Sequence, residues 1–423
     1  MRFIATSIRW FLLLLALAIV FFNLRLYWPS PLSAQRSALP PDLIAQLAAS
    51  REAFAGDTPE QMQGLFPEGY YFCYAFYGLT WAEAAMRDNS LTAQAIDEIR
   101  WCLDKLESPA GKEAFSPNLP PDHGMFYSAW KAHLRAGLVT IQNGSDTTEL
   151  NLLRDECDAI RESISAVNSP FMESYVGSVW PCDTIPAIHA MASYDRVGSE
   201  ARYESFIRDW VSEAQARIDP ATGLLPHTAV VADGSPLQGS RATSQVIFLR
   251  MLPDIDEDFA REQYTAFRDQ FQKPFLCLPS ILEYPNGTQG QGDVDSGPLI
   301  FGRSLSATVM MIGVAQIYGD QAIADAIAKT GEVVGLPWTS DDKKCYCGGA
   351  LPIGDIMVSY SQNAIRWQNQ SAHHPTAKQA LPWYWRWPVH LISVATIAIG
   401  WRFFRKRKTE GKTEASAKNP TEG

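Results

Sequence analysis

Side chains that can act as general acids, general bases or nucleophiles stand at or just before the starts of several predicted helices. Carboxyl groups in different environments acquire different pKa values, so that one donates a proton while another accepts it. Tyrosine, histidine and cysteine side chains can assist such acid–base chemistry. The residues predicted to be catalytic are Glu68, Tyr74, His123, Cys182, Asp183 and Asp295. The residues predicted to bind substrate are Tyr70, Trp130, Glu173, Tyr175, Arg241 and Asp293.

The densest group of such residues is the segment QGQGDVDSGP at residues 289–298, which holds three glycines, two aspartates and a serine before an apolar stretch. Glycines let the backbone approach a ligand closely, and two neighbouring aspartates can take different environments. If Glu68, Asp183 and Asp295 meet in one cleft, they supply a general acid and a general base.

Each candidate also has a structural interpretation. Asp183 and Asp295 each precede a proline in a predicted first helical turn, where a side-chain cap is worth about 1 kcal/mol. Glu68 stands in a first turn as well, and an acid there interacts favourably with the helix dipole. Cys182 could be a small buried apolar residue. The aromatic run within residues 70–81 either packs in the core or lines an apolar or sugar-binding cleft.

The elements that must position these residues are predicted to be helices, because helical periodicity dominates the chain from residue 68 onward. Short links such as residues 88–90 join close antiparallel neighbours, and longer Pro/Gly-rich links such as residues 282–298 separate the pairs. This pattern predicts an all-α protein, a single α/α toroid of about six helical hairpins with an inner and an outer ring. The candidate helices are 40–54, 70–88, 90–107, 124–141, 147–166, 184–195, 198–217, 239–252, 258–273, 298–318, 320–334 and 353–368.

The inner ring is expected to consist of helices that start with small or aromatic residues, such as GMFYSAW at 124–130. The outer ring is expected to consist of charged, amphipathic helices such as that at 201–218. All inner helices of such a ring run in the same direction, so their N-termini meet at one rim. The residues predicted to point into one cavity at this rim are Glu68, His123, Cys182, Asp183 and Asp295, with Asp122, His227 and Asp355 as further polar residues nearby.

The N-terminal segment resembles a membrane anchor. Residues 10–22, WFLLLLALAIVFF, carry no charge, and Arg2 and Arg9 precede them. The run alone fits the core of a signal peptide, but residues 3–8 extend it to spanning length. We expect an uncleaved anchor, because Leu32-Ser33-Ala34 makes a poor cleavage site; a cleaved signal peptide is the alternative.

A second apolar run, residues 387–401, lies between the aromatic residues 383–385 and the basic cluster at 402–408. This order is typical of a stop-transfer helix, and a buried core helix is the alternative. The positive-inside rule then places both termini in the cytoplasm and residues 29–380 outside, in the periplasmic or extracellular space. The predicted divisions are an anchor at 1–28, a linker with a possible first helix at 29–66, the toroid at 67–370, a linker and aromatic belt at 371–386, a transmembrane helix at 387–404 and a disordered basic tail at 405–423.

The charge distribution excludes one class of partner. Residues 29–401 hold 26 basic and 43 acidic residues, a net charge of −17. Nucleic-acid binding needs a basic face that displaces counterions, so an acidic body argues against it. The oligomeric state is left open by the sequence.

The seven cysteines are compatible with an oxidising compartment, and their odd number leaves at least one free or paired between chains. The chain has no CxxC pair and no histidine spaced with cysteine as in a zinc site, so we expect no metal. It also lacks a P-loop or Rossmann glycine pattern, and we expect no cofactor.

Four short motifs resemble the linalool dehydratase-isomerase family of α/α toroids: FPEGYYFCY (66–74), MFYSAW (125–130), WPCDTIPAI (180–188) and GSRATS (239–244). The resemblance implies dehydration or isomerisation of small isoprenoid alcohols by acid–base chemistry without a cofactor. It also implies that Glu68 and Tyr74 match an acid and a tyrosine on the first inner helix, and that Cys182 matches a pocket cysteine. Trp130 stands where the family pattern has a histidine, and Glu173 where it has a second cysteine.

Three classes of function follow. The first is a membrane-anchored extracytoplasmic enzyme of the lyase or isomerase type that acts on a small apolar alcohol. The second is a glycan-processing hydrolase or lyase on the same scaffold, since DVDSGPLIFG (293–302) resembles inner-helix starts of toroid enzymes that act on sugars. The third is a non-catalytic, membrane-tethered binding or scaffold protein, in which the carboxylates are all helix caps and no cleft gathers them.

Overall fold

The computed structural model describes the chain except for residues 1, 34, 36–37, 199–200, 369–380 and 418–423. Over the described residues the protein is mainly α-helical, and its strands are only two or three residues long. The all-α class predicted from the sequence is therefore confirmed. Most of the large buried side chains belong to one continuous hydrophobic core.

Six helices with extensive burial contact one another in a closed succession. α4 contacts α7, α7 contacts α9, α9 contacts α11, α11 contacts α13, α13 contacts α15, and α15 returns to α4. Small residues permit close approach: a side chain at Gly78 of α4 would meet Leu134 of α7 at 2.7 Å. These helices are α4 (Gly69–Arg87), α7 (Met125–Ile141), α9 (Ile185–Val197), α11 (Ala242–Met251), α13 (Leu305–Ile317) and α15 (Pro352–Gln362).

Each of these helices contacts a second, more polar helix that buries only one face. In α8, for example, the buried residues Leu153, Cys157, Ile160 and Ile164 recur every three or four positions, which is the helical period. The polar helices are α2 (Leu43–Ala55), α5 (Thr92–Glu107), α8 (Thr147–Ser165), α10 (Glu204–Gln215), α12 (Glu257–Phe271) and α14 (Gln321–Val334).

Short elements complete the body. β1 (Glu173–Tyr175), β2 (Ser178–Val179), β3 (Thr228–Ala229) and β4 (Pro236–Gln238) form an antiparallel sheet, and β5 (Trp338–Ser340) pairs with β6 (Lys343–Cys345). These strands are too short to show a two-residue period and were not predicted. The short helices are α3 (Thr58–Leu65), α6 (Pro109–Lys112), η1 (Asn89–Leu91), η2 (Pro181–Asp183), η3 (Leu252–Asp254) and η4 (Cys347–Gly349).

Three predicted helix boundaries of the body were wrong by six residues or more. The helix expected at 198–217 begins at Glu204, so residues 201–203 precede it. The helix expected from residue 298 begins at Leu305, because the hydroxyl of Ser304 accepts a hydrogen bond from the Ala307 N–H and caps the helix there. The chain between α12 and α13 is therefore an irregular loop. The helix expected to reach residue 368 ends at Gln362, since the carbonyls that follow accept hydrogen bonds from the Arg87 side chain.

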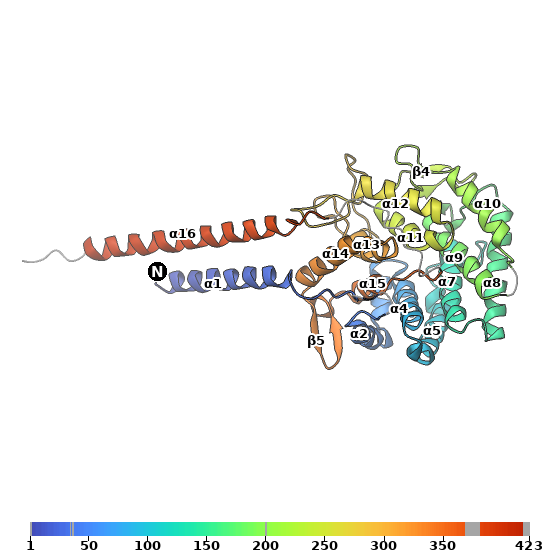
Figure 1. Ribbon diagram of the computed structural model, residues 1–423, viewed down its shortest axis with the longest axis horizontal. Helices are drawn as coiled ribbons and strands as arrows, with labels where there is room; N and C mark the ends of the chain where they lie inside the picture. The colour runs from blue at the N-terminus through green and yellow to red at the C-terminus, as the bar shows by residue number, and fades with distance from the viewer. Residues whose placement is uncertain (1, 34, 36–37, 199–200, 369–380, 418–423) are drawn as a thin grey trace, which may run out of the picture.

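α1 (Arg2–Arg25) and α16 (Trp387–Ala417) lie side by side and project away from the body (Figure 1). Among the described residues, Thr6–Arg25 is the one helical stretch both long and apolar enough to cross a membrane. Its 20 residues correspond to about 30 Å of helix. The Asn23 amide donates to the Ser393 hydroxyl at 2.7 Å, which ties the two helices together.

The C-terminal divisions differ from the prediction in one respect. α16 continues to Ala417, past the boundary expected at residue 404, so the helix includes most of the segment predicted to be disordered. The lysine, glutamate and alanine residues of this stretch are good helix formers. Residues 369–380, which include much of the predicted linker at 371–386, and residues 418–423 lie outside the described residues.

Candidate active site

Glu68, Tyr175, Asp183 and Asp295 interact with one another. Glu68 occupies the N-cap position of α4, Tyr175 ends β1, and Asp183 ends η2, directly before α9. The Tyr175 hydroxyl donates a hydrogen bond to Glu68 Oε1. Burial raises the pKa of Tyr175, and the charges of Glu68, Asp183 and Asp295 raise it further. Segments more than a hundred residues apart thus supply one group of three carboxyls and a phenol.

Asp183 is the most deeply buried of these carboxyl groups, with 7% of the residue exposed. The Ser174 hydroxyl donates a hydrogen bond of 2.5 Å to Asp183 Oδ2. Burial raises the pKa of Asp183 to about 8; the bond from Ser174 opposes this rise, whereas Glu68 and Asp295 add to it. Asp183 therefore holds a proton at neutral pH and can donate it.

Asp295 lies in the loop between α12 and α13. The residue as a whole is exposed, but the many protein atoms around its carboxyl group exclude part of its hydration. This desolvation raises the pKa of Asp295 to about 7, and Asp293 and Glu68 contribute in the same direction while Arg241 opposes them. A carboxyl group whose pKa is raised toward neutrality can act as an acid or as a base.

A chain of polar side chains continues from Asp183 toward α11. Cys182 Sγ lies 3.7 Å from Asp183 Oδ1, and Ser244 also bonds the thiol. Ser244 Oγ lies 2.6 Å from His227 Nδ1, and His227 Nε2 lies 3.3 Å from Arg241 Nη1. Ser174, Ser244 and Glu283, which accepts a hydrogen bond from Arg241, were not among the predicted residues, because nothing in their local sequence distinguishes them.

The protonation states along this chain follow from its geometry. Burial, followed by the charge of Arg241, lowers the pKa of His227 to about 4, so the ring is neutral at pH 7. Arg241 can only donate, so Nε2 accepts and Nδ1–H donates to Ser244. Burial raises the pKa of Cys182, with Asp183 as the next contribution, which keeps it a thiol. Cys182 can thus line the site or donate a weak hydrogen bond, but it is not poised as a thiolate nucleophile.

Arg241 and Asp293, both predicted to bind substrate, pair with each other. Arg241 stands at the N-cap position of α11; its Nη1 donates to Asp293 Oδ2 and its Nε to Glu283 Oε1 at 2.8 Å. Thr243 also donates to Glu283 Oε1, at 2.9 Å. These bonds hold both ends of the 283–293 segment against α11 and so position the neighbouring Asp295. The side chains of Arg241 and Asp293 thus position this loop.

Tyr74 was predicted to be catalytic, but its side chain is turned away from this group. Its hydroxyl donates to the Phe54 carbonyl on α2 at 3.0 Å, and its ring lies 4.9 Å from that of Tyr70. Residues 68, 72 and 76 share one face of α4, and residues 70, 74 and 77 share another, because successive residues are about 100° apart. Trp130 packs against the first of these faces, at Phe72 and Phe76.

His123 and Glu173 are engaged in local contacts. His123 Nδ1 lies 2.9 Å from Asp122 Oδ1, and its ring lies 5.0 Å from that of Tyr127. Glu173 Oε1 accepts a hydrogen bond from the Gly177 N–H across the β1–β2 turn. The positive φ of His123 and Gly124 turns the chain tightly before α7, which directs the imidazole toward Asp122 and Tyr127.

The interpretation of Asp183 and Asp295 as helix caps was wrong, whereas Glu68 does stand at a helix start, as its interpretation in terms of the helix dipole requires. The N-cap residue of α9 is Thr184, which makes no side-chain cap, and Asp183 bonds Ser174 instead of a helical N–H. α13 is capped by Ser304, and Asp295 precedes it by nine positions. Glu68 occupies the N-cap position of α4 but makes no capping hydrogen bond. Burial of these groups is thus not explained by helix termination.

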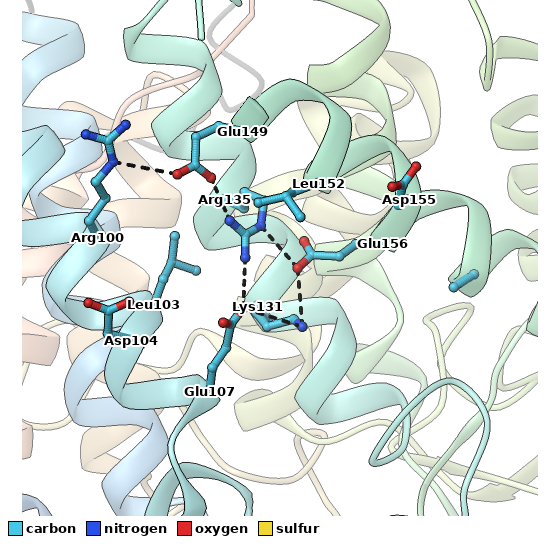
Figure 2. A pocket seen from close by; sticks show the side chains of 11 residues that line it. Arg100, Leu103, Asp104, Glu107, Lys131, Arg135, Glu149, Leu152, Asp155 and Glu156 are labelled. Carbon is cyan, nitrogen blue, oxygen red and sulfur yellow. Dashed lines mark hydrogen bonds and ion pairs between the residues drawn. The ribbon is translucent and has the colours of Figure 1, made fainter. Parts of the chain in front are cut away.

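A pocket of about 570 Å³ lies away from this group, among α5, α7 and α8. Figure 2 shows Arg135 between Glu107, Glu149 and Glu156, at 2.8, 2.6 and 3.1 Å. The opposite charges neutralise one another across the pocket, and these ion pairs link the three helices. Among the described residues no three His, Cys, Asp or Glu side chains are arranged to hold a metal ion.

Comparison of the chain with protein-family models found no match, and comparison with curated proteins found none either.

Proposed function

We propose that this chain is a membrane-anchored α/α-toroid enzyme of the lyase or isomerase type, which acts on a small apolar alcohol by acid–base chemistry without a cofactor. The observation that carries the proposal is the meeting of Glu68, Asp183 and Asp295 around Tyr175, with pKa values of about 8 for Asp183 and about 7 for Asp295. Carboxyl groups that differ in burial and in neighbouring charge can serve as the general acid and the general base of one reaction.

The toroid is supported by the closed succession of contacts from α4 through α15 back to α4. One polar helix separates each buried helix from the next along the chain, so the buried helices run in the same direction around the ring. Their N-terminal ends then share one rim, and Glu68, Asp183 and Arg241 all stand at such ends. The helix dipoles at this rim also favour negative charge that develops during a reaction.

A dehydration assigns each side chain a role. Asp183 donates its proton to the substrate hydroxyl, which leaves as water when the C–O bond breaks. Glu68 removes a proton from the adjacent carbon, and the electron pair of that C–H bond forms the C=C bond. Tyr175, which already donates to Glu68, orients this base. A proton transferred from Glu68 back to Asp183 through solvent or Asp295 restores the starting state.

The membrane assignment is supported by the paired projection of α1 and α16 (Figure 1). Side chains such as Phe11, Leu14 and Leu391 are exposed along these helices, as expected for contact with lipid. Basic residues precede the apolar run of α1 and follow that of α16, so the positive-inside rule favours a cytoplasmic location for both ends and an extracytoplasmic body.

The glycan-processing alternative needs aromatic rings open to stack on sugars. The aromatic run of α4 is instead packed in the core: Tyr70, Tyr71, Tyr74 and Tyr77 are all at most 3% exposed. The scaffold alternative required the carboxylates to be helix caps, and they make no such bonds. These observations favour the lyase or isomerase proposal.

The proposal is tested with the full-length chain in membranes and a panel of small isoprenoid alcohols. Asp183→Asn and Glu68→Gln should each lower turnover by about 10²–10⁴ while the melting temperature shows that the fold is retained. Asp122→Asn is the matched control, since this side chain is 69% exposed and bonds none of the four residues. Equal turnover in all three variants and the parent protein would overturn the assigned roles, and no turnover in the parent on any alcohol would overturn the substrate class.

A further inference from the structure

The base of the α1–α16 pair is packed against the body. Leu26, Ala326 and Trp385 form a small buried cluster, to which Leu278 and Val333 contribute. Arg25 at the end of α1 forms an ion pair of 3.2 Å with Glu332 of α14. The pair of helices is therefore docked against α14 and the α12–α13 loop, and its direction relative to the body is defined.

Apolar side chains on the loop next to this base are exposed. Leu276 is two residues from the packed Leu278 and is 46% exposed, and Phe301 is 74% exposed. Both residues have positive φ values, 49° and 50°, which are rare for bulky residues and mark tight turns. The Phe301 ring stacks on Phe275 at 5.0 Å. The turns thus present an apolar surface to the outside.

A second exposed apolar group lies on the other packed segment. Val334 follows the packed Val333 and is 70% exposed, Leu336 is 49% exposed, and Trp338 at the start of β5 is 68% exposed. Figure 1 shows α14 and β5 on the side of the body from which α1 and α16 project, whereas α8 and α10 lie on the opposite side.

Interfacial side chains surround the same base. Trp28, Trp383 and Trp387 are each more than half exposed, and the guanidinium of Arg386 lies over the Trp385 ring at 4.2 Å. Trp and Tyr side chains concentrate at the level of lipid headgroups, and arginine side chains can pair with the phosphates of those headgroups. Arg303 lies next to the turn of Phe301 and places a further cation beside this apolar surface.

We propose that this face of the body, formed by the turns at Leu276 and Phe301 and by the Val334–Trp338 segment, rests in the headgroup region of the bilayer that α1 and α16 cross. The occupant is a lipid bilayer because both segments adjoin the base of the two helices, through Leu278 and Val333, at the point where the helices leave the body. The inference rests on the proposed membrane anchor and not on the assigned catalytic roles.

The contact bears on the candidate active site. The loop that carries Leu276 and Phe301 also carries Asp293 and Asp295, and Arg241 anchors its middle part to α11. A loop seated in the interface holds the accessible Asp295 carboxyl close to the membrane surface. An apolar alcohol dissolved in lipid is concentrated at that surface, which agrees with the substrate class proposed above.

The test uses the full-length chain in cell membranes with the photoreactive residue p-benzoylphenylalanine in place of Phe301 or Trp338. Leu237 is the matched control position, since it is 66% exposed on β4, a strand that Figure 1 shows away from the projecting helices. Irradiation should produce phospholipid adducts, identified by mass spectrometry, at positions 301 and 338. At position 237 irradiation should produce no more phospholipid adduct than is found in the unirradiated sample.

Extraction with alkaline carbonate separates this inference from the anchor on which it rests. If the chain stays in the membrane pellet but positions 301 and 338 yield no more lipid adduct than position 237, the interface contact is refuted and the anchor stands. Adducts with another protein in place of lipid refute the contact equally. Release of the chain by carbonate overturns both the anchor and the contact.

Discussion

Replacement of Asp183 by asparagine is expected to stabilise the protein at neutral pH while it removes activity. The carboxyl group has a reference pKa of 3.8 and a folded-state pKa of about 8. At pH 7 the unfolded chain therefore holds this group ionised, whereas the folded protein must hold it protonated. Folding then requires uptake of a proton, which costs free energy at that pH.

The magnitude follows from the two pKa values. Between 3.8 and 8 the stability contribution of Asp183 falls by about 1.4 kcal/mol for each pH unit, because the folded state binds one proton more than the unfolded state. At pH 7 the accumulated cost is at most about 4 kcal/mol, and relaxation around the site reduces it. Below pH 3.8 the cost vanishes. Asparagine is neutral at every pH and can still accept the Ser174 hydrogen bond.

Urea denaturation of parent and Asp183→Asn proteins between pH 5 and 8 measures this difference. The asparagine variant should gain stability relative to the parent as the pH rises, and its turnover should be lost over the whole range. Asp122→Asn should show no comparable trend. If Asp183→Asn is instead destabilised by about 1 kcal/mol at every pH and stays active, the side chain has only a structural role and the reasoning is wrong.

Other perturbations test the remaining parts of the structure. Turnover should fall as the pH rises above about 8, when Asp183 loses its proton. The parent protein should lose about 3 kcal/mol of stability as the pH falls from 6.5 to about 4, since the buried imidazole of His227 resists protonation. The His227→Gln variant should not show this loss. Glu83→Gln should cost about 3–5 kcal/mol, because it leaves the buried Arg250 guanidinium without the carboxylate that pairs with it at 2.7 Å. Gly124→Ala should cost roughly 1–3 kcal/mol, because Gly124 has a φ of 88° and the new Cβ would lie 2.6 Å from the Ser174 carbonyl oxygen.

Each of these has a result that would contradict it. A pH–rate profile that stays level to pH 10 would remove Asp183 as the acid. Equal acid sensitivity of parent and His227→Gln would show that the imidazole titrates normally. Wild-type melting temperatures for Glu83→Gln or Gly124→Ala, measured in the full-length chain, would show that the buried ion pair or the tight turn before α7 contributes nothing measurable.

Local patterns were sufficient for most helices. The period of apolar residues in α5, α7 and α8 can be read from neighbouring residues alone, and the observed bounds lie within two residues of those predicted. The start of α13 was missed because the residues before it, Arg303 and Ser304, pair with Leu282 and Ile281, contacts that no local pattern indicates. The strands were missed for a related reason, since two or three residues carry no detectable period.

The helical period could also have separated two of the site predictions. Glu68 and Tyr74 are six positions apart, which places them about 240° apart around α4, so they could not both face the same neighbours. The sequence could not tell which of the two faces the other carboxyl groups. That choice depends on α2 and α5, which cover Tyr74, and on β1, which brings Tyr175 to Glu68.

What the sequence by itself determined is therefore what depends on neighbouring residues: the helical class, most helix positions, the apolar N-terminal span and the set of residue types able to move protons. Only the tertiary structure decided which of these residues meet, that Arg241 is committed to Glu283 and Asp293, and that Asp183 holds its proton. The physical reason is that a pKa depends on burial and on nearby charges. For Asp183 the nearby charges that raise its pKa are those of Glu68 and Asp295, each more than a hundred positions away along the chain.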